Sequence, residues 1–204
     1  MFIKNVLDKV FGLILLILLA PILLIIAFAI KLDSRGPIIF KQKRLGKNGN
    51  IFEIYKFRTM YVDAPDIRNE DGSTFNSDND PRVTRVGNVL RKTSLDELTQ
   101  IFNILKGEMS FIGPRPDLPD HYELYTDFDK RKLLVKPGVT GYAQCNGRNN
   151  IEWKNRIEMD IFYIENYSIL LDVQILIKTA LSVLKSEGVN KSVEHEEVEE
   201  AKNI

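Results

Sequence analysis

Hydrophobic positions are concentrated first in one uninterrupted run, from Val10 to Ile30, which contains no charged residue. At ~1.5 Å per residue, a helix over this run is ~30 Å long, which matches the thickness of a bilayer core. The run is longer than the apolar part of a cleavable signal peptide, and no small-x-small cleavage site follows it. The pattern therefore predicts a membrane anchor over residues 1–31.

Pro21, in the middle of this run, leaves two topologies open. Its ring removes a backbone hydrogen bond and kinks or breaks a helix, but a kinked helix still spans lipid. Lys4 and Lys9 precede the run and Lys31 opens a basic stretch after it, so both ends favour the cytoplasmic side. A re-entrant helix broken at Ala20–Pro21 and a plain transmembrane helix both fit, and either one leaves the rest of the chain in the cytoplasm.

Shorter patterns predict the remaining elements. Two short runs, 38–44 and 51–57, flank a Gly-containing turn at 46–49 and predict a β-hairpin. The polar stretch 62–81 predicts either a binding loop or lid, or surface disorder. Apolar residues spaced three and four apart predict helices over 95–105, 153–164 and 173–184.

The helix predicted over 173–184 has the clearest apolar stripe, and Asp172 is its expected cap. Such a stripe more often packs on a core than lies on a membrane, and both interpretations stay open. The fold class predicted is α/β, mostly helical, with a re-entrant membrane helix, a small β-hairpin or sheet and several amphipathic helices at the membrane interface. Residues 32–190 are expected to form one cytoplasmic domain, and 191–204 an acidic, disordered tail.

The distribution of charge adds to this picture. The 28 basic and 28 acidic residues cancel, which argues against nucleic acid as a partner. Between Lys31 and Met60, however, basic residues outnumber acidic ones eight to two, which suits an anionic membrane surface or a phosphorylated substrate. The single cysteine, Cys145, forms no internal disulfide, and no Cys/His cluster has zinc spacing, so we interpret it as a packed residue.

The segment from Ser94 to Glu97 is the first that could carry chemistry. It reads as a capping box, in which the two residues exchange hydrogen bonds at the start of a helix. Alternatively, Asp96 stands ionised and exposed in the first turn, where free N–H groups and the helix dipole also attract phosphate. Four cations precede it: Arg82, Arg85, Arg91 and Lys92. A carboxylate beside cations suits phosphoryl transfer better than glycoside hydrolysis, which needs two carboxyls across a sugar.

Two further segments suit phosphate and nucleotide binding. Pro114 and Pro116 fix the backbone on both sides of Arg115, which presents a bidentate donor. The alternative is a rigid turn with a solvent-facing arginine. Residues 136–149 are rich in Gly, amide and Arg side chains and allow close approach of a nucleotide, although ordinary loops share this composition.

Six stretches between about Lys4 and Asn190 together resemble the bacterial sugar transferase family, the monotopic polyprenyl-phosphate phosphoglycosyl transferases. They are Lys56–Met60, Asp80–Thr84, Ser94–Leu98 with Gln100, Asn103–Pro116, Lys136–Gly141 and Asn146–Asn149, in the order the family has them. Several motifs at these spacings are a specific signal. The resemblance moves the interpretation of Ser94–Glu97 from capping to catalysis.

The resemblance implies transfer of a sugar-1-phosphate from a UDP-sugar to polyprenyl (undecaprenyl) phosphate, the first membrane step of glycoconjugate or exopolysaccharide biosynthesis. Asp96 would attack the sugar-bearing phosphate and release UMP, and the carrier would then attack the aspartyl phospho-sugar. Mg²⁺ is the implied cofactor, with Glu97 as metal ligand or proton handler and Asp96 as a second candidate ligand. The implied substrate-binding residues are Lys56, Arg58, Arg82, Arg115, Arg148 and Asp160.

The resemblance also favours the re-entrant anchor, at the cytoplasmic face of the bacterial inner membrane and in contact with its lipid. Family members often have Ser-Pro at the break, whereas Ala20 precedes Pro21 here. Two other functions remain: an ordinary glycosyltransferase that releases UDP, and a non-catalytic membrane scaffold in which Ser94 and Glu97 only cap a helix. The sequence identifies neither the sugar nor the oligomeric state.

Overall fold

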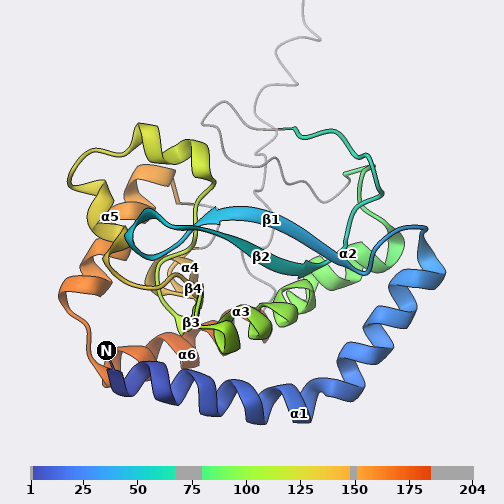
Figure 1. The fold of residues 1–204 in the computed structure, drawn as a ribbon, viewed down its shortest axis with the longest axis horizontal. Coiled ribbons are helices and arrows are strands. Elements are labelled where there is room, and N and C mark those ends of the chain that lie inside the picture. Colours follow the sequence, from blue (N-terminus) through green and yellow to red (C-terminus); the bar gives the residue numbers. More distant parts are fainter. Residues whose placement is uncertain (1, 68–79, 148–150, 185–204) are drawn as a thin grey trace, which may run out of the picture.

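A computed structural model describes residues 2–67, 80–147 and 151–184, and helices dominate this part of the chain (Figure 1). Its β structure consists of two small two-stranded sheets. The predicted fold class, mostly helical with a small sheet, is confirmed. The acidic tail predicted over 191–204 and most of the polar stretch 62–81 lie outside the described residues, so those two expectations stay predictions.

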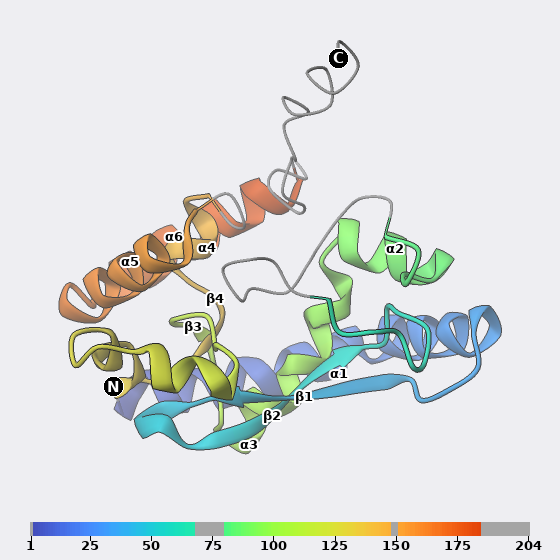
Figure 2. The same cartoon turned by 90° about the horizontal axis from the view of Figure 1, so that it is seen from above.

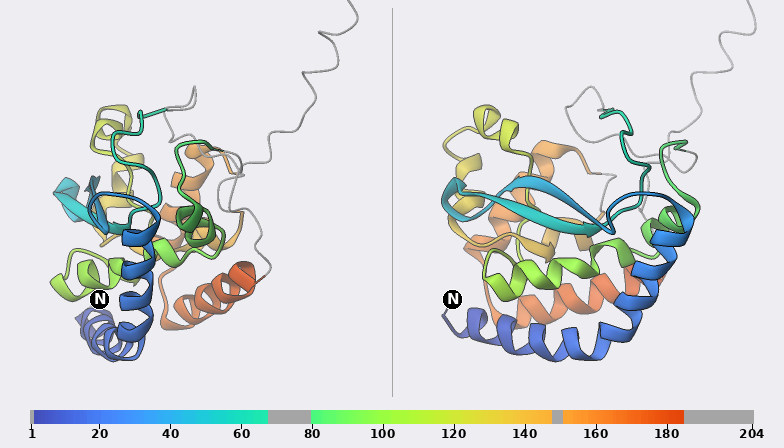
Figure 3. Two further views of the ribbon diagram at one scale, coloured as in Figure 1. Left: turned by 90° about the vertical axis from the view of Figure 1, so that its right-hand side faces the viewer. Right: turned by 45° about the vertical axis from the view of Figure 1, so that its right-hand side comes forward.

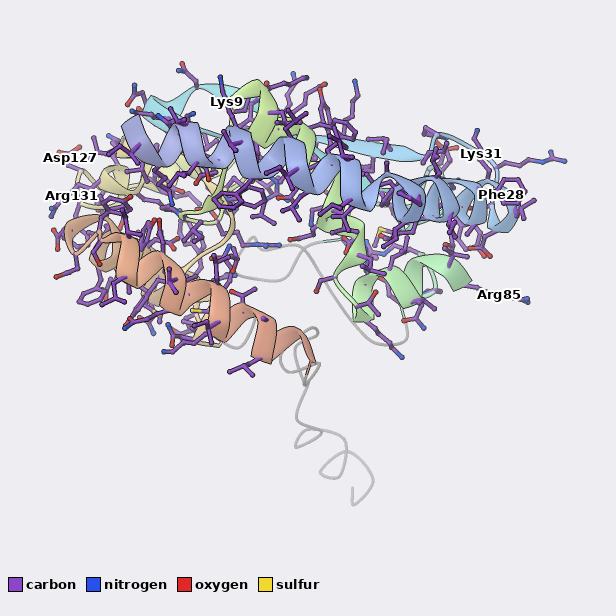
Figure 4. All side chains as sticks on the ribbon, turned by 90° about the horizontal axis from the view of Figure 1, so that it is seen from below. Lys9, Phe28, Lys31, Arg85, Asp127 and Arg131 are labelled. Carbon is purple, nitrogen blue, oxygen red and sulfur yellow. The ribbon has the colours of Figure 1, made fainter. Side chains whose placement is uncertain are left out.

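Helix α1 (Phe2–Asp33) contains the whole apolar run, with Pro21 inside it. The helix bends near its middle instead of breaking (Figure 1). Proline accounts for such a bend because its ring removes one hydrogen bond and displaces the preceding turn. Most large side chains of α1 are exposed, among them Leu24, Ile25 and Phe28, of which Figure 4 labels the last. Within the described residues, α1 alone is long and apolar enough to cross a membrane.

The predicted hairpin is present as β1 (Ile39–Leu45) and β2 (Ile51–Phe57), which pair antiparallel. A 3-10 turn, η1 (Lys47–Gly49), joins them, and Asn48 takes a left-handed φ of 59° in it. Seen from above, α1 runs along the length of this hairpin (Figure 2).

The chain after β2 alternates short helices with very short strands. The elements are α2 (Arg85–Lys92), η2 (Leu95–Gln100), α3 (Ile101–Lys106), β3 (Ser110–Ile112), η3 (Pro119–Leu124), η4 (Asp129–Leu134), β4 (Gly138–Thr140), α4 (Tyr142–Cys145), α5 (Trp153–Glu165) and α6 (Ile169–Leu184). The stripe predicted over 95–105 is thus divided between η2 and α3, and it ends at Gly107, whose φ is 84°. Cys145 is half-buried in α4 and packs among apolar side chains, as expected.

Both halves of α1 contact the rest of the fold. Ile26 and Ile30, in the C-terminal half, pack with Phe57 of β2 and Leu90 of α2 in one buried cluster. The N-terminal half lies against α3, where Leu105 and Ile104 approach Gly12. The helix is therefore attached to the domain on both sides of its bend.

Helix α5 buries the stripe that its sequence predicts. Ile157 and Ile161 are almost fully buried and pack with Leu45, Tyr125 and Leu133. Helix α6 does the opposite, because its predicted stripe faces outward. Four residues of that stripe are about half exposed: Val173, Leu176, Ile177 and Leu181. The predicted stripe is therefore not the face that packs on the core; Ile175, which is 1% exposed, and Leu171 pack there instead.

Asp172 is not the cap of α6. Ser168 is, since its hydroxyl accepts a hydrogen bond from the Leu171 N–H at 3.1 Å. The Asp172 carboxylate instead accepts from Lys4 Nζ of α1 at 2.5 Å and from the Tyr163 hydroxyl at 2.7 Å. The sequence could not indicate this role, because Lys4 and Asp172 lie 168 positions apart. The pair joins the start of α1 to α6, and both helices lie on the same side of the molecule (Figure 3).

Gly87 allows α2 to pack closely against the backbone at Thr59, just after β2. A Cβ at Gly87 would lie 2.0 Å from the carbonyl oxygen of Thr59, a backbone atom that cannot move aside easily. Thr84 fixes the same contact, because its hydroxyl caps α2 and its N–H donates to Thr59 O at 2.9 Å. The close approach therefore requires glycine.

We expect Gly87→Ala to lower the free energy of unfolding by about 3 kcal/mol, because the added methyl group forces α2 away from Thr59. Thermal unfolding of the detergent-solubilised protein measures the effect. Val89→Ala is the matched control in the same helix: Val89 is 59% exposed, so its truncation should change stability by less than about 0.5 kcal/mol. Equal melting temperatures for the two variants would contradict this account of α2.

Candidate active site

Asp96 and Glu97 lie in η2, a short helix with two chemically different sides. Leu95 and Leu98 pack on the buried cluster at the C-terminal half of α1. The two acidic side chains face β2, where Lys56 lies. The helix therefore connects the apolar anchor directly to a charged centre.

The capping-box interpretation of this segment is wrong. Ser94 has a left-handed φ of 57° and its hydroxyl caps no backbone N–H. The Glu97 N–H donates instead to the Ser94 carbonyl oxygen, at 3.4 Å. An N-cap needs an extended backbone, and Ser94 cannot supply one because its left-handed conformation turns the chain from α2 into η2. Asp96 and Glu97 are thus free of a capping role.

Glu97 is held by two cations. Lys56 Nζ donates to Glu97 Oε1 at 2.7 Å, and Arg115 Nη1 lies 3.6 Å from the same oxygen. Burial alone would raise the pKa of Glu97, but Lys56 and Arg115 outweigh it and lower this pKa from 4.5 to about 2. Glu97 is therefore firmly ionised at neutral pH.

Asp96 has the opposite balance. Its Oδ2 lies 3.9 Å from Lys56 Nζ, and only 13% of its side chain is exposed. Burial and the neighbouring Glu97 carboxylate raise the pKa of Asp96, although Lys56 and Arg91 act against them. We expected an ionised and exposed carboxylate, and the expected exposure is wrong because β2 and α2 both pack against η2. Adjacent carboxyls with pKa values pushed apart are typical of functional sites.

Arg91 completes the ring of cations on the α2 side. Its Nε donates to the Thr59 hydroxyl at 3.0 Å, which fixes the guanidinium, and its charge lowers the pKa of Asp96. The sequence placed Arg91 in the basic cluster before the carboxylates without assigning it a role. Lys56, Arg91 and Arg115 thus reach the carboxylate pair from three separate segments.

The structure places the turn that carries Arg115 next to the Gly-rich segment that begins at residue 136. The sequence alone did not indicate that these two segments are neighbours. β3 and β4 pair in parallel, with Ser110 opposite Gly138. The Gly138 N–H donates to the carbonyl oxygen of Pro114 at 2.9 Å, and a Cβ on Gly138 would lie 2.1 Å from the Gly113 nitrogen. Only glycine permits this approach, which fixes the turn that carries Arg115.

Arg58 and Arg82, both predicted to bind substrate, are used elsewhere. Arg58 is buried and donates to the carbonyl oxygens of Ser34 and Pro37 and to the Ser34 hydroxyl, so it holds the chain where α1 ends. Arg82 forms a buried bidentate pair with Asp80, whose pKa it lowers through those hydrogen bonds. The structure brings neither guanidinium to the carboxylate pair. Arg148 lies outside the described residues.

Asp160 is also placed apart from the pair. It is not a solvent-facing helix residue, because Asp160 is 1% exposed and pairs with Lys132 Nζ at 3.1 Å. Lys132 also binds Asp117, and Arg44 interacts electrostatically with both Asp117 and Glu97. The sequence analysis missed Arg44, Asp117 and Lys132. No local pattern could have found them, because their partners are distant in sequence.

The fold and the site define a class of protein: a helical domain with a long apolar helix at its start and a largely buried carboxylate pair surrounded by cations. The chain belongs to the bacterial sugar transferase family, whose model matches residues 1–186.

Relatives support the family assignment. "Uncharacterized sugar transferase EpsL" of Bacillus subtilis is 41% identical over 192 residues, which cover 94% of this chain and 92% of that protein. "Undecaprenyl-phosphate galactose phosphotransferase" of Salmonella typhimurium is 39% identical over 198 residues, 92% of this chain and 41% of that one. "UDP-glucose:undecaprenyl-phosphate glucose-1-phosphate transferase" of Klebsiella pneumoniae is 44% identical over 197 residues, 93% and 41%. The chain therefore spans well under half of the latter two proteins.

We expect Lys56→Met to raise the pKa of the Glu97 carboxyl from about 2 by at least about one unit, because the variant removes the cation that most lowers it. The pKa of Asp96 rises as well, since Lys56 is also its largest lowering influence. A pH titration of ¹³C-labelled carboxyl signals in detergent micelles measures both shifts.

Lys41→Met is the matched control on the neighbouring strand. Lys41 is 56% exposed and pairs with Glu53 at 3.5 Å, so its loss should leave both titrations unchanged. If the Glu97 titration were the same in the wild-type protein and in Lys56→Met, Lys56 would not set the charge of this site.

Proposed function

We propose that this protein transfers a sugar-1-phosphate from a UDP-sugar to polyprenyl phosphate and releases UMP. The observation that carries the proposal is the carboxylate pair: one carboxyl firmly ionised and one with a raised pKa, 3.9 Å or less from the same lysine. The names of the Salmonella and Klebsiella relatives give undecaprenyl phosphate as acceptor, and the Klebsiella name gives UDP-glucose as donor. The sugar used by this chain stays open.

Asp96 is the nucleophile of the proposed reaction. Its carboxylate oxygen forms a bond to the sugar-bearing phosphorus, and the bond from that phosphorus to the bridging oxygen breaks, with UMP as the leaving group. A phosphate oxygen of polyprenyl phosphate then attacks the same phosphorus and displaces Asp96, which returns as a carboxylate. Burial supports this role, since a carboxylate that is less stabilised as an anion is the better nucleophile.

The cations around the carboxylate pair are placed to compensate the negative charge of the donor. Lys56 and Arg115 lie where they would offset the charge of the donor's phosphates, and Arg91 lies on the other side of Asp96. Glu97, with a pKa of about 2, suits a ligand or electrostatic role, because a proton carrier needs a pKa near the working pH. Of the two roles that the resemblance implies for Glu97, metal ligand or proton handler, this pKa favours the metal ligand.

A magnesium ion fits these residues if the phosphates of the substrate supply part of its coordination. Among the residues that the structure describes, no group of three or more His, Cys, Asp or Glu side chains is arranged to hold a metal. Mg²⁺, however, commonly binds one or two carboxylates together with substrate phosphates and water. Asp96 and Glu97 would hold the ion, which would supply positive charge against the diphosphate when bound.

The two other candidate functions differ in what the structure offers them. A scaffold in which Ser94 and Glu97 only cap a helix has lost its basis, because that cap is absent. An ordinary glycosyltransferase would release UDP. The discriminating assay supplies a panel of UDP-sugars, polyprenyl phosphate and Mg²⁺ to the detergent-extracted protein and identifies the nucleotide released.

We further propose that α1 is re-entrant and that both its ends face the cytoplasm. Lys4 pairs with Asp172, and the Asp8 carboxylate accepts a hydrogen bond from the Phe111 N–H at 3.3 Å, so the start of α1 is tied to the domain. At the other end, Asp33 accepts from the Val86 N–H at 3.0 Å. A helix with both ends on one domain cannot place them on opposite faces of a bilayer.

The outward stripe of α6 supports a membrane interface on the same side. Val173, Leu176 and Ile177 are each about half exposed, and α6 lies on the side of the molecule where α1 lies (Figures 3 and 4). An amphipathic helix buries such a face in the headgroup region. The catalytic domain, proposed as residues 32–190, would then rest on the cytoplasmic surface of the inner membrane.

We expect Asp96→Asn to abolish UMP release and to leave no sugar-phosphate adduct on the protein, because an amide is not a nucleophile toward phosphorus. Intact-protein mass spectrometry after incubation with donor alone measures the adduct, which the wild-type protein should carry. Asp127→Asn is the matched control at an exposed site and should behave as wild type. Normal turnover by Asp96→Asn would rule out the nucleophile assignment.

For the topology, we expect Ile3→Cys, in a Cys145→Ser background, to react with a membrane-impermeant maleimide only in inside-out vesicles. Ile3 is 66% exposed at the start of α1, so the reagent reaches it wherever that end meets water. Asp127→Cys, in the domain, gives the reference side. Labelling of the two cysteines from opposite faces would show a spanning helix.

A further inference from the structure

Behind the turn that carries Arg115 lies a buried cluster of charged groups that the proposed reaction does not use. Lys132 Nζ lies 2.6 Å from Asp117 Oδ2 and 3.1 Å from Asp160 Oδ2, and the Tyr125 hydroxyl donates to the same Asp117 oxygen at 2.5 Å. Lys132 is 4% exposed and Asp160 is 1% exposed. The cluster joins three segments: η4, α5 and the chain just after Pro116.

A buried lysine is retained only where its charge is compensated. Here two carboxylates compensate it: burial lowers the pKa of Lys132, but Asp117 and Asp160 outweigh that effect and raise it. Loss of Lys132 would leave two buried carboxyls without their shared cation. Stability alone is a weak reason for such a cluster, since apolar residues of similar volume often serve as well.

The position of Asp117 suggests what the cluster does. Asp117 is two residues after Arg115, and its carbonyl oxygen accepts from the Leu45 N–H at 2.9 Å. Arg44 Nη1 donates to the carbonyl oxygen of Pro116 at 3.2 Å. The backbone beyond Arg115 is thus fixed by β1, while Lys132 fixes the Asp117 side chain.

Arg115 itself has little else to hold its direction. Its side chain is 42% exposed, and its ion pair with Glu97 among the described residues is at 3.6 Å. A long side chain with no close contact samples several rotamers, so the region that its guanidinium reaches is set by the position of the backbone that carries it. The geometry of the phosphate contact therefore depends on the segment that Asp117 anchors.

We propose that Lys132 is a positioning residue, which holds Asp117 and thereby directs Arg115 toward the donor's phosphates beside Glu97. The proposal rests on the proposed function for the identity of the donor, but the underlying claim is that anion binding by Arg115 depends on Lys132. Asp160 acts in the same unit, as the second carboxylate that holds Lys132. This assigns Asp160 a place behind the site instead of a contact with substrate.

A double-mutant cycle tests the proposal. We expect Lys132→Met to lower kcat/KM for the UDP-sugar by at least about tenfold, because small displacements of a positioned group cost large factors in rate. In an Arg115→Ala background, the same substitution should change kcat/KM by less than about twofold, because the residue through which it acts is absent. A merely structural role predicts an equal loss in both backgrounds, and that result would overturn the proposal.

Two further variants keep the test decisive. Tyr125→Phe removes one hydrogen bond to Asp117 without changing the shape of the side chain, and we expect a smaller loss that again vanishes with Arg115→Ala. It replaces Lys132→Met as the test if that variant does not fold. Lys130→Met is the matched control: Lys130 lies in the same η4 segment, is 42% exposed and pairs with Asp127 at the surface, so its loss should leave kcat/KM unchanged.

A binding measurement separates this proposal from the proposed function. Isothermal titration with inorganic pyrophosphate and Mg²⁺ gives a dissociation constant that needs no turnover. We expect Lys132→Met to weaken this binding about tenfold, and to have no effect in the Arg115→Ala background. If the wild-type protein released no UMP from any donor, the proposed function would fail. The pyrophosphate dissociation constants of the single and double variants would still test whether anion binding by Arg115 depends on Lys132. Unchanged pyrophosphate binding in folded Lys132→Met or Tyr125→Phe would overturn the positioning role.

Discussion

The site depends on the contact between Lys56 and two adjacent carboxylates that the fold has largely withdrawn from water. Asp96 is 13% exposed and Glu97 20%, and two neighbouring buried carboxylates repel each other. Lys56 on β2 compensates both, Arg115 adds to Glu97 and Arg91 to Asp96. Because these cations come from a strand, a helix and a proline-fixed turn, the charge balance exists only when all three segments are in place.

This requirement explains why so much of the small domain supports one short helix. The η2 segment is held by apolar contacts to α1 on one side and by ion pairs to β2 on the other. Arg58 closes the connection between α1 and β1, and the Arg82–Asp80 pair fixes the chain before α2. Arg58 and Arg82, which the resemblance implied as substrate-binding residues, thus help to build the frame in which the carboxylate pair and its cations come together.

The sequence predicted the parts of this structure that depend on local pattern. The apolar run, the hairpin turn, the Gly107 end of α3 and the stripe of α5 each follow from spacing or from a residue with special backbone geometry. The structure differs from the prediction where contacts between distant segments determine the local conformation. Ser94 has the residue type of a cap, but its left-handed conformation is set by the turn between two helices. The stripe of α6 has the period of a core helix, and nothing local indicates that it faces outward.

The candidate site follows the same division. Motifs identified Asp96, Glu97, Lys56 and Arg115, which the structure brings together. The expectation that Asp160 binds substrate came from the family resemblance, whereas its environment depends on Lys132, which belongs to no motif. A buried lysine between two aspartates from different segments leaves no periodic trace in the chain, so only the folded arrangement reveals it.

Under the proposed transfer, one nucleophile must meet a donor from water and an acceptor from lipid, and the structure resolves this conflict within a single turn of chain. Leu95 and Leu98 face the apolar helix while Asp96 and Glu97 face the cations of β2 and the Arg115 turn. A nucleophile deeper in the anchor would lose the cations that keep it charged, because a carboxylate in lipid is neutralised. A nucleophile further out would be beyond the reach of a carrier phosphate at the membrane surface. The placement of η2 between α1 and β2 satisfies both constraints, and the ion pair between Lys4 and Asp172 would keep α1 and α6 at the same level of the proposed membrane interface.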